Sequence, residues 1–471
     1  MQITNNLSLL DLSVFAIWIT LSIGVIIIRR LKNLNSKTSD KDYILMGRKL
    51  TLPLFVATLV SSWYGGVFGV TQIAFEHGIY NFITQGLFWY IAYIIFAYFL
   101  VKKIHQKNAL TFPDLIKKTY GEKSAKLAAI LLIFKALPIT YALSLGAFIQ
   151  TMFGLSLPLS IVAGTSVVVL YTCISDFRSV VYSDFLQFCC MYFGVITVVI
   201  FSFYSIGNPL VLVENLPPHY FTPSGKHEFS TIILWLFIAF SATLISPVFY
   251  QRCMAAGSPL IAKKGIIIST AFWIVFDICT TLGGMYAKVH MPDANSLNAY
   301  LLFGLEILPS GFRGIFLAGI TATVISTLDS FIFASSTLFS YDLRPKKYTA
   351  SGRYRTISVL SIGFLTVIIA LQFDNVIEDV WITLEGYFGA LLIIPIIWSY
   401  FIKTKISDKA FIFTAFLSMS IMLIKDVFFR NIKIEAFYFG LIATLTVYSF
   451  IFLYERSIKK LICKVFKKIL F

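Results

Sequence analysis

Apolar stretches long enough to cross a lipid bilayer recur along the whole chain, and they constrain the fold more than any other feature. A membrane-spanning helix needs about 20 predominantly apolar residues. Because lipid offers no hydrogen-bond partners to an open backbone, we expect each stretch to be helical and the protein to be an all-α polytopic membrane protein. Thirteen stretches meet or approach the required length, with approximate limits 9–28, 52–75, 80–101, 127–152, 156–175, 180–205, 230–250, 265–288, 312–340, 356–373, 380–402, 410–428 and 435–454.

The composition supports a membrane protein and argues against a nucleic-acid partner. Of the 471 residues, 58% are hydrophobic and 13% are charged, and the mean hydropathy is +0.82. A soluble domain would carry about 25% charged residues. The net charge of +16 comes from basic residues that cluster between apolar stretches, which is the pattern of cytoplasmic loops rather than of a nucleic-acid-binding surface.

The distribution of lysine and arginine predicts the orientation of the chain. If the N-terminus lies outside the cell, every second loop is basic, beginning with Arg29 and Arg30, whereas the alternate loops hold mainly acidic residues. Only the loop at 425–433 is mixed. We therefore expect a multi-pass protein of the inner (plasma) membrane with a cytoplasmic C-terminus. Its basic, amphipathic tail, residues 456–471, is expected to lie against anionic lipid.

The ninth stretch carries a line of hydroxyl groups. On a helix, Thr323, Ser326, Thr327 and Ser330 share one face, with Asp329 at its edge. Such hydroxyls often serve the packing of membrane helices. A carboxylate inside a bilayer, however, is costly unless it faces an ion, a proton or a cationic partner. The spacing alone leaves both interpretations open.

Two of the predicted spans are interrupted. Small and polar residues crowd the second stretch between 61 and 69, and Pro247 lies late in the seventh, five spans later. Interrupted helices at corresponding places in two groups of five predict an inverted-repeat transporter whose binding site lies at the interruptions. Close packing against a neighbouring helix is the alternative reading of the glycines.

Several charged residues lie well inside predicted spans. We assign a functional role to Asp184, Asp329 and Glu385, whereas Asp277 and Lys135 are better explained as interfacial residues or as halves of structural pairs. Carboxylate and hydroxyl oxygens are hard ligands, which suit Na⁺ or H⁺ better than a transition metal. We expect no cofactor other than Na⁺ as the coupling ion.

Four segments of the chain share a pattern with one known family. They are GRKLTLPLFVATLVSSWYGGVFG, YTCISDFRSVVYSDFLQ, PVFYQRCMAA and GIFLAGITATVISTLDSFIFASSTLFSYDL. They resemble the first core helix, the fifth, the end of the sixth and the eighth of the sodium:solute symporter family, which includes bacterial proline, galactose and sialic acid carriers. The resemblance implies two inverted five-helix repeats at 51–228 and 229–404, preceded by an N-terminal span and loop at 1–50 and followed by two helices at 405–455. It also implies sodium-coupled uptake of a small polar solute by alternating access.

The resemblance implies a sodium site between the first and eighth core helices. Matching ISTL places two hydroxyl ligands on Ser326 and Thr327 and a carbonyl ligand on Thr323, where the family usually has alanine. Threonine has the same backbone carbonyl as alanine, so this ligand is retained.

The carbonyl ligands from the first helix depend on how the segment is aligned. Alignment on the tryptophan selects Ser61 and Tyr64, whereas alignment on Gly69 selects Leu59 and Ser62. Both assignments stay open at the level of sequence.

The resemblance also suggests a further cation site. Asp184 matches an aspartate that holds a second sodium in some members, and the two serines of that site correspond to Asp329 and Ser330. Two carboxylates around one site either bind a cation strongly or share a proton. The chain departs from the family at two places, since Ser175 and Asp176 replace the usual pair of glycines before the fifth helix and the usual Asp-Gln of the sixth helix is absent. Because the sixth helix helps to build the solute pocket in the family, these departures concern the solute rather than the fold.

The solute class is not fixed by the sequence. An amino acid, a carboxylate, a sugar or a vitamin would each be compatible with the polar and aromatic residues near the interruptions, and the oligomeric state has no sequence signal. The candidate solute ligands are Ser62, Trp63, Gly65, Tyr141, Ser241, Thr243 and Glu385, with Lys135 and Tyr64 nearby.

Two other functions are compatible with parts of the sequence. A transporter-like sensor would bind the solute without accumulating it, but nothing resembling a kinase or receiver follows the last span. A membrane enzyme with Asp176 and Asp184 as metal ligands would turn over a lipid substrate, but no aspartate-rich motif supports it.

Overall fold

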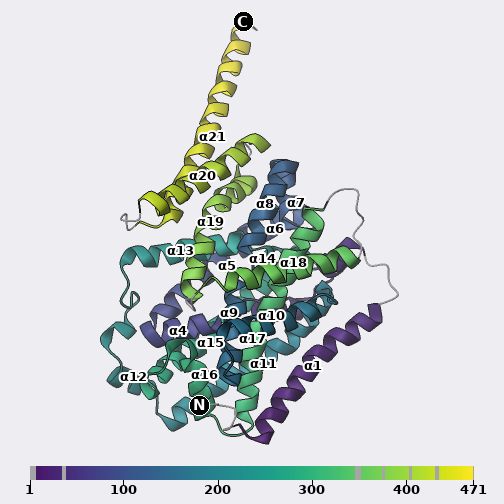
Figure 1. Ribbon diagram of the computed structural model, residues 1–471. Coiled ribbons are helices and arrows are strands. Elements are labelled where there is room, and N and C mark those ends of the chain that lie inside the picture. The colour runs from purple at the N-terminus through teal and green to yellow at the C-terminus, as the bar shows by residue number, and fades with distance from the viewer. Residues whose placement is uncertain are drawn as a thin grey trace.

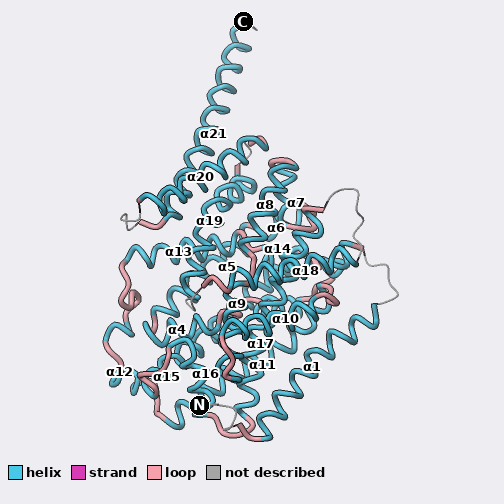
Figure 2. Tube along the Cα trace, viewed as in Figure 1, coloured by secondary structure: helices cyan, strands magenta, loops and turns pink. Residues whose placement is uncertain are grey.

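The computed structural model describes residues 7–33, 39–344, 352–373, 377–402, 406–429 and 434–469. These residues form helices joined by short connections, with no β-strand among them (Figure 2). Within them, ten helices are long and apolar enough to cross a membrane, or up to eleven if one bent pair forms a single span. The all-α membrane fold is therefore confirmed, whereas the count of thirteen spans stays a prediction.

The helices follow one another in the order seen in Figure 1, in which the chain runs from purple to yellow. The first half comprises α1 (Leu9–Asn33), α2 (Asp40–Leu45), η2 (Met46–Arg48), α3 (Leu52–Ser61), α4 (Val67–His77), η3 (Phe82–Leu87), α5 (Phe88–Phe99), α6 (Val101–Gln106), α7 (Phe112–Thr119), α8 (Glu122–Lys135), α9 (Ile139–Phe153), α10 (Leu157–Thr172) and α11 (Phe177–Ser205). The second half comprises α12 (Leu210–Asn215), η4 (Pro218–Phe221), α13 (Phe229–Leu244), α14 (Pro247–Ala255), α15 (Pro259–His290), α16 (Ser296–Ile307), α17 (Phe312–Thr337), η5 (Leu338–Asp342), α18 (Gly352–Ala370), α19 (Ile377–Phe401), α20 (Asp408–Phe428) and α21 (Ala436–Ile469).

The first interruption separates α3 from α4, between Ser61 and Val67. Two adjacent glycines allow neighbouring helices to approach the backbone there. A Cβ on Gly65 would lie 2.5 Å from the Cβ of Thr327 in α17, and a Cβ on Gly66 would lie 2.2 Å from the ring of Trp381 in α19. Close packing against these two helices therefore requires glycine at both positions.

The second interruption separates α13 from α14, which are bent by 42° relative to each other. Pro247 lacks a backbone N–H and occupies the first turn of α14, where no intrahelical donor is needed. Ser246 caps the new helix by accepting a hydrogen bond from the N–H of Phe249 at 3.2 Å. The predicted kink is therefore a full helix break with its own N-cap.

The two interrupted helices are joined at one end by the backbone. The N–H of Leu50, just before α3, donates to the carbonyl of Ala255 at 3.1 Å. The N–H of Gly257, just after α14, donates to the carbonyl of Leu50 at the same distance. The entry to the first broken helix therefore lies beside the exit from the second.

Helix α17 occupies the centre of the bundle (Figure 1). In its apolar window 89% of the residues are buried, compared with 28% in α20 and in α21, whose outer faces are left for lipid. It packs closely on α11, because a Cβ on Gly319 would lie 2.8 Å from the carbonyl oxygen of Cys190. The predicted tail continues α21 as far as Ile469 and projects from the body, and its side chains beyond Tyr454 lie outside the described residues.

Candidate functional site

The hydroxyl stripe of α17 meets the first helix interruption. Ser326 Oγ donates to the carbonyl oxygen of Ser61 at 2.7 Å, and Thr327 Oγ1 lies 3.1 Å from the same oxygen. The two hydroxyls also lie 3.2 Å and 3.0 Å from the carbonyl of Thr323. All four residues are buried. Four uncharged oxygens of the kind that binds alkali cations therefore converge at the end of α3.

Two of the other candidate carbonyls of the first helix, those of Tyr64 and Leu59, accept hydrogen bonds within their own segment. The Tyr64 carbonyl accepts from the N–H of Val67 at 3.0 Å, and the Leu59 carbonyl accepts from Ser62 Oγ at 3.3 Å. Ser61, which one of the two alignments selects, is therefore the residue whose carbonyl contacts the hydroxyls of α17. The side chain of Tyr64 instead lines a cavity, described below.

A second polar site lies one helical turn further along α17 and is charged. Arg252 of α14 donates from Nη2 to Ser330 Oγ at 2.7 Å, and the same nitrogen is 3.4 Å from Asp184 Oδ2. That carboxylate also accepts from Thr58 Oγ1 at 2.5 Å. The side chains of Arg252 and Asp184 are fully buried. A guanidinium of the chain itself therefore contacts both Asp184 and Ser330.

Asp329 completes this charged site. Its Oδ2 accepts a hydrogen bond from the hydroxyl of Tyr171 at 3.1 Å, and it interacts electrostatically with both Asp184 and Arg252. The site thus contains two carboxylates and one guanidinium. With all three ionised it would hold one negative charge in excess, and a buried unpaired charge is strongly unfavourable.

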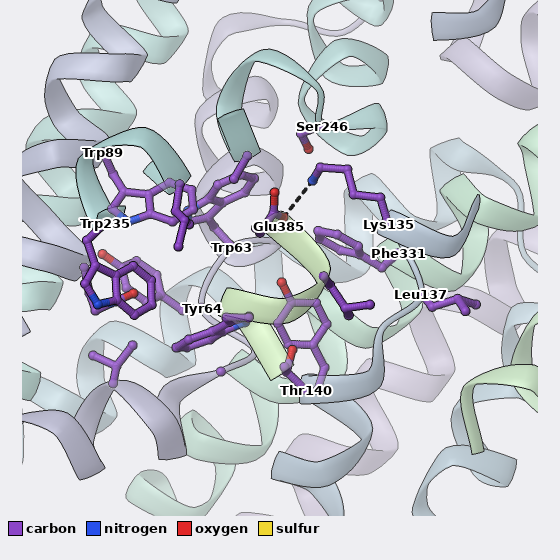
Figure 3. Close-up of a pocket in the computed structure, with 18 residues that line it drawn as sticks. Trp63, Tyr64, Trp89, Lys135, Leu137, Thr140, Trp235, Ser246, Phe331 and Glu385 are labelled. Carbon is purple, nitrogen blue, oxygen red and sulfur yellow. Dashed lines mark hydrogen bonds and ion pairs between the residues drawn. The ribbon is translucent and has the colours of Figure 1, made fainter. Parts of the chain in front are cut away.

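A cavity of about 90 Å³ lies between the two helix interruptions (Figure 3). Both interruptions contribute to its wall, together with η3, α5, α8, α9, α17 and α19. The lining residues are Trp63, Tyr64, Gly66, Val70, Gln85, Trp89, Lys135, Leu137, Thr140, Tyr141, Trp235, Ile238, Ala242, Ser246, Phe331, Trp381, Leu384 and Glu385.

An ion pair belongs to the wall of this cavity. Lys135 Nζ lies 2.8 Å from Glu385 Oε1, and the two side chains are 3% and 15% exposed (Figure 3). Lys135 is the last residue of α8 and Glu385 lies in α19. The pair therefore joins two helices that are 250 residues apart in the chain.

The predicted solute ligands divide into two groups. Trp63, Tyr141 and Glu385 line the cavity, whereas Ser62, Gly65, Ser241 and Thr243 are not among its lining residues. Each of these four residues makes a contact elsewhere in the structure. Gly65 packs on Thr327, Ser62 Oγ bonds to the Leu59 carbonyl, Thr243 Oγ1 bonds to the Ala239 carbonyl at 2.8 Å, and Ser241 faces Gly389 of α19.

Sequence reasoning missed two sets of residues at these sites. Arg252 was used only as part of a family signature, although a guanidinium within an apolar segment is itself a signal for a buried ion pair. The tryptophans Trp89, Trp235 and Trp381 gave no local signal, because each belongs to a different helix and only the fold brings them to one cavity.

Comparisons with known proteins agree with this architecture. The family model described as sodium:solute symporter family matches residues 43–412. The sodium/pantothenate symporter of Haemophilus influenzae is 26% identical over 388 residues, covering 76% of this chain and 78% of that protein. The sodium/glucose cotransporter of Vibrio parahaemolyticus is 23% identical over 418 residues, covering 79% and 75%.

Solved structures show the same fold at low identity. A substrate-bound, outward-open Na⁺-coupled sialic acid symporter aligns with a TM-score of 0.78 at 15% identity, covering 93% of this chain and 96% of that one. A nucleobase-cation-symport-1 family transporter in a closed conformation aligns with a TM-score of 0.53 at 13% identity, covering 85% and 92%.

Proposed function

The chain belongs to the sodium:solute symporter family, and we propose that it imports a small polar organic solute together with Na⁺ by alternating access. Its family consists of membrane transporters rather than enzymes, so the protein is a multi-pass transporter. The observation that carries the proposal is the convergence of the Ser326 and Thr327 hydroxyls with the Ser61 and Thr323 carbonyls.

The geometry suggests how ion and solute binding are linked. Without an ion, the hydroxyl protons of Ser326 and Thr327 satisfy the buried carbonyl of Ser61. A bound Na⁺ would instead take the lone pairs of these oxygens and fix the spacing between α17 and the first interruption. Because Trp63 and Tyr64 of that interruption line the cavity, the ion would favour one cavity shape and so raise solute affinity.

The topology belongs to the same proposal. We assign the two inverted repeats to residues 51–228 and 229–404, each beginning with an interrupted helix, and the last two helices to 405–455. Thirteen spans then require α3–α4 and the short apolar helix α10 to cross the bilayer. The proposed orientation has the N-terminus outside and the C-terminus in the cytoplasm. The bridge between Leu50 and Ala256 supports a shared end for the two interrupted helices.

The ion site can be tested with Na⁺ alone. Thermal unfolding of the purified protein in NaCl and in KCl of equal ionic strength should show stabilisation specific to Na⁺, as expected for an ion that binds only the folded state. Ser326→Ala and Thr327→Val should abolish it. Ser336→Ala is the matched control, because its hydroxyl bonds to the Phe333 carbonyl further along the same helix. Equal stabilisation by K⁺ would contradict the site.

Transport needs a second measurement. In proteoliposomes, a solute identified by binding should accumulate only under an inward Na⁺ gradient. Binding without accumulation would instead favour the sensor hypothesis.

We also propose that Asp184, Asp329 and Ser330 form a second coupling site for one H⁺ or Na⁺. Arg252 neutralises one carboxylate, which leaves room for a single positive charge. Asp184→Asn and Asp329→Ser should each change the ion dependence of uptake and the number of cations per solute. Unchanged ion dependence and stoichiometry in both variants would end this hypothesis.

A further inference from the structure

The ion pair in the cavity wall retains unused binding capacity. Lys135 carries three N–H donors and bonds to Glu385 through one carboxylate oxygen, Oε1. The other oxygen of Glu385, Oε2, is buried without a hydrogen-bond partner among the described residues. Both charged side chains line the cavity, and neither uses its full hydrogen-bonding capacity in the pair (Figure 3).

Seven of the other sixteen lining residues are aromatic. Four tryptophans contribute to the wall, Trp63, Trp89, Trp235 and Trp381, and Figure 3 shows Trp63, Trp89 and Trp235 together on the side away from Lys135. Indole faces pack against apolar groups and attract cations, but they offer no acceptor to a sugar hydroxyl. A polyhydroxylated solute would therefore depend on the few uncharged polar side chains of the wall for its hydrogen bonds, which belong to Tyr64, Gln85, Thr140, Tyr141 and Ser246.

Charge balance further limits the classes of solute that the cavity can bind. The pair is neutral as it stands, so a carboxylate that displaced Glu385 from Lys135 would leave Glu385 unpaired in a buried site. A lone cation bound to Glu385 would leave Lys135 unpaired in the same way. Leaving one member of a buried ion pair without a partner is strongly unfavourable. A solute that carries both charges satisfies both residues and adds no net charge.

We infer that the transported solute is a zwitterion with an apolar body, of the class of the free α-amino acids. Its carboxylate pairs with Lys135, its cationic nitrogen pairs with Glu385, and its body packs on the tryptophans. This inference rests on the proposed function, because it assigns a ligand class to the cavity of the symporter. It also gives the pair a role in transport, since the solute takes over the link between α8 and α19.

The first experiment compares matched solutes by thermal unfolding in NaCl. The panel contains the common L-α-amino acids, the N-acetyl derivative of each, which lacks the cation, the amide of each, which lacks the carboxylate, and D-glucose. At least one free amino acid should stabilise the protein. Its two derivatives should bind about tenfold more weakly or worse, as expected when one partner of a buried charge pair is lost.

The second experiment uses variants to test which residue contacts which charge of the solute. Glu385→Gln should weaken binding of the amino acid far more than binding of its N-acetyl derivative. Lys135→Gln should weaken binding of the amino acid far more than binding of its amide. The double variant Lys135→Gln with Glu385→Gln removes both charges together, so it leaves no unpaired charge and should fold while discriminating little among the three forms. Lys126→Gln is the matched control, because it breaks the exposed Lys126–Glu122 pair on the same helix.

The outcomes separate this inference from the symporter assignment. The zwitterion inference would be overturned if only glucose stabilised the protein, if no amino acid did, or if the double variant still discriminated among the three forms. Stabilisation by glucose that appears only in NaCl would overturn the zwitterion inference but support sodium coupling. An amino acid that stabilises equally in KCl and loses discrimination in the double variant would support the zwitterion while sodium coupling fails.

Discussion

The two polar sites along α17 handle the burial of polar groups in opposite ways. The first, with Ser326 and Thr327, is built from neutral oxygens that satisfy one another through hydrogen bonds. The second, with Asp329 and Ser330, contains carboxylates that cannot do so, and Arg252 lies among them. A neutral site can therefore lose its ion without leaving a buried charge, whereas an anionic site needs a permanent counter-charge.

This difference predicts different functional roles. If Na⁺ binds to the neutral site as proposed, it adds a full charge there, so occupancy of the site would depend directly on the external ion. The charged site already contains a cation and changes by at most one further charge. We therefore expect the neutral site to drive transport, and the charged site to set stability first and coupling second.

The largest predicted effect comes from removing the guanidinium. Arg252→Met would leave Asp184 and Asp329 buried without their cation, and loss of one partner from a buried ion pair lowers the free energy of unfolding by about 3–5 kcal/mol. Thermal unfolding in detergent would show a large fall in Tm. Adding Asp329→Ser to Arg252→Met should restore part of that loss. An unchanged Tm in the single variant would mean that Arg252 does not balance the carboxylates.

The next effect concerns the neutral site. In Gly65→Ala the new methyl group would lie 2.5 Å from Thr327 Cβ and 2.7 Å from the ring of Tyr141. Overpacking of this kind costs about 1–3 kcal/mol, and it would push Thr327 away from the Ser61 carbonyl. We expect weaker stabilisation by Na⁺ in thermal unfolding. Gly24→Ala is the control, since nothing lies within 4 Å of a Cβ at that position.

The sequence predicted the neutral site better than the charged one for a physical reason. The helix breaks come from local chemistry, because glycines weaken helix and proline lacks a donor. The hydroxyl stripe follows from helical periodicity alone. The breaks and the stripe therefore follow from the sequence, together with the all-α fold, whereas the contact of Ser326 and Thr327 with Ser61 matches one of the two alignments that the family resemblance leaves open.

The charged site and the cavity depend on contacts between distant segments. Arg252 and Asp184 are 68 residues apart, and Asp329 and Tyr171 are 158 apart, so no local pattern links them. The cavity also depends on an interruption of the fourth predicted span, which was expected to be one helix. The structure ends α8 at Lys135 and begins α9 at Ile139. That turn places Lys135 in the cavity wall.

A smaller effect should appear in the ion dependence of the charged site. If the pair Asp184 and Asp329 holds one H⁺ or Na⁺, the two ions compete, so raising the pH should raise the apparent affinity for Na⁺. Asp329→Asn removes the extra carboxylate and should flatten this dependence by several-fold, while Na⁺ specificity at the neutral site is retained. The measurement is the Na⁺ titration of uptake at a series of pH values. A steep pH dependence in Asp329→Asn would place the titrating group elsewhere.

The smallest predicted effect is a loss of folding stability at low pH that does not involve ion coupling. At the end of α4, outside the spanning segments, burial and the neighbouring His227 lower the pKa of His77 from 6.5 to about 4. The neutral form is thus favoured in the folded state, and the stability it contributes above pH 6.5 is lost as the pH falls towards 4. The imidazole is partly exposed, so we expect a loss of only about 1–2 kcal/mol. His77→Gln should reduce the fall in Tm between these pH values but leave the Na⁺ titration unchanged. If the variant instead changed the Na⁺ titration, the pH dependence of uptake would not isolate the carboxylates of α17.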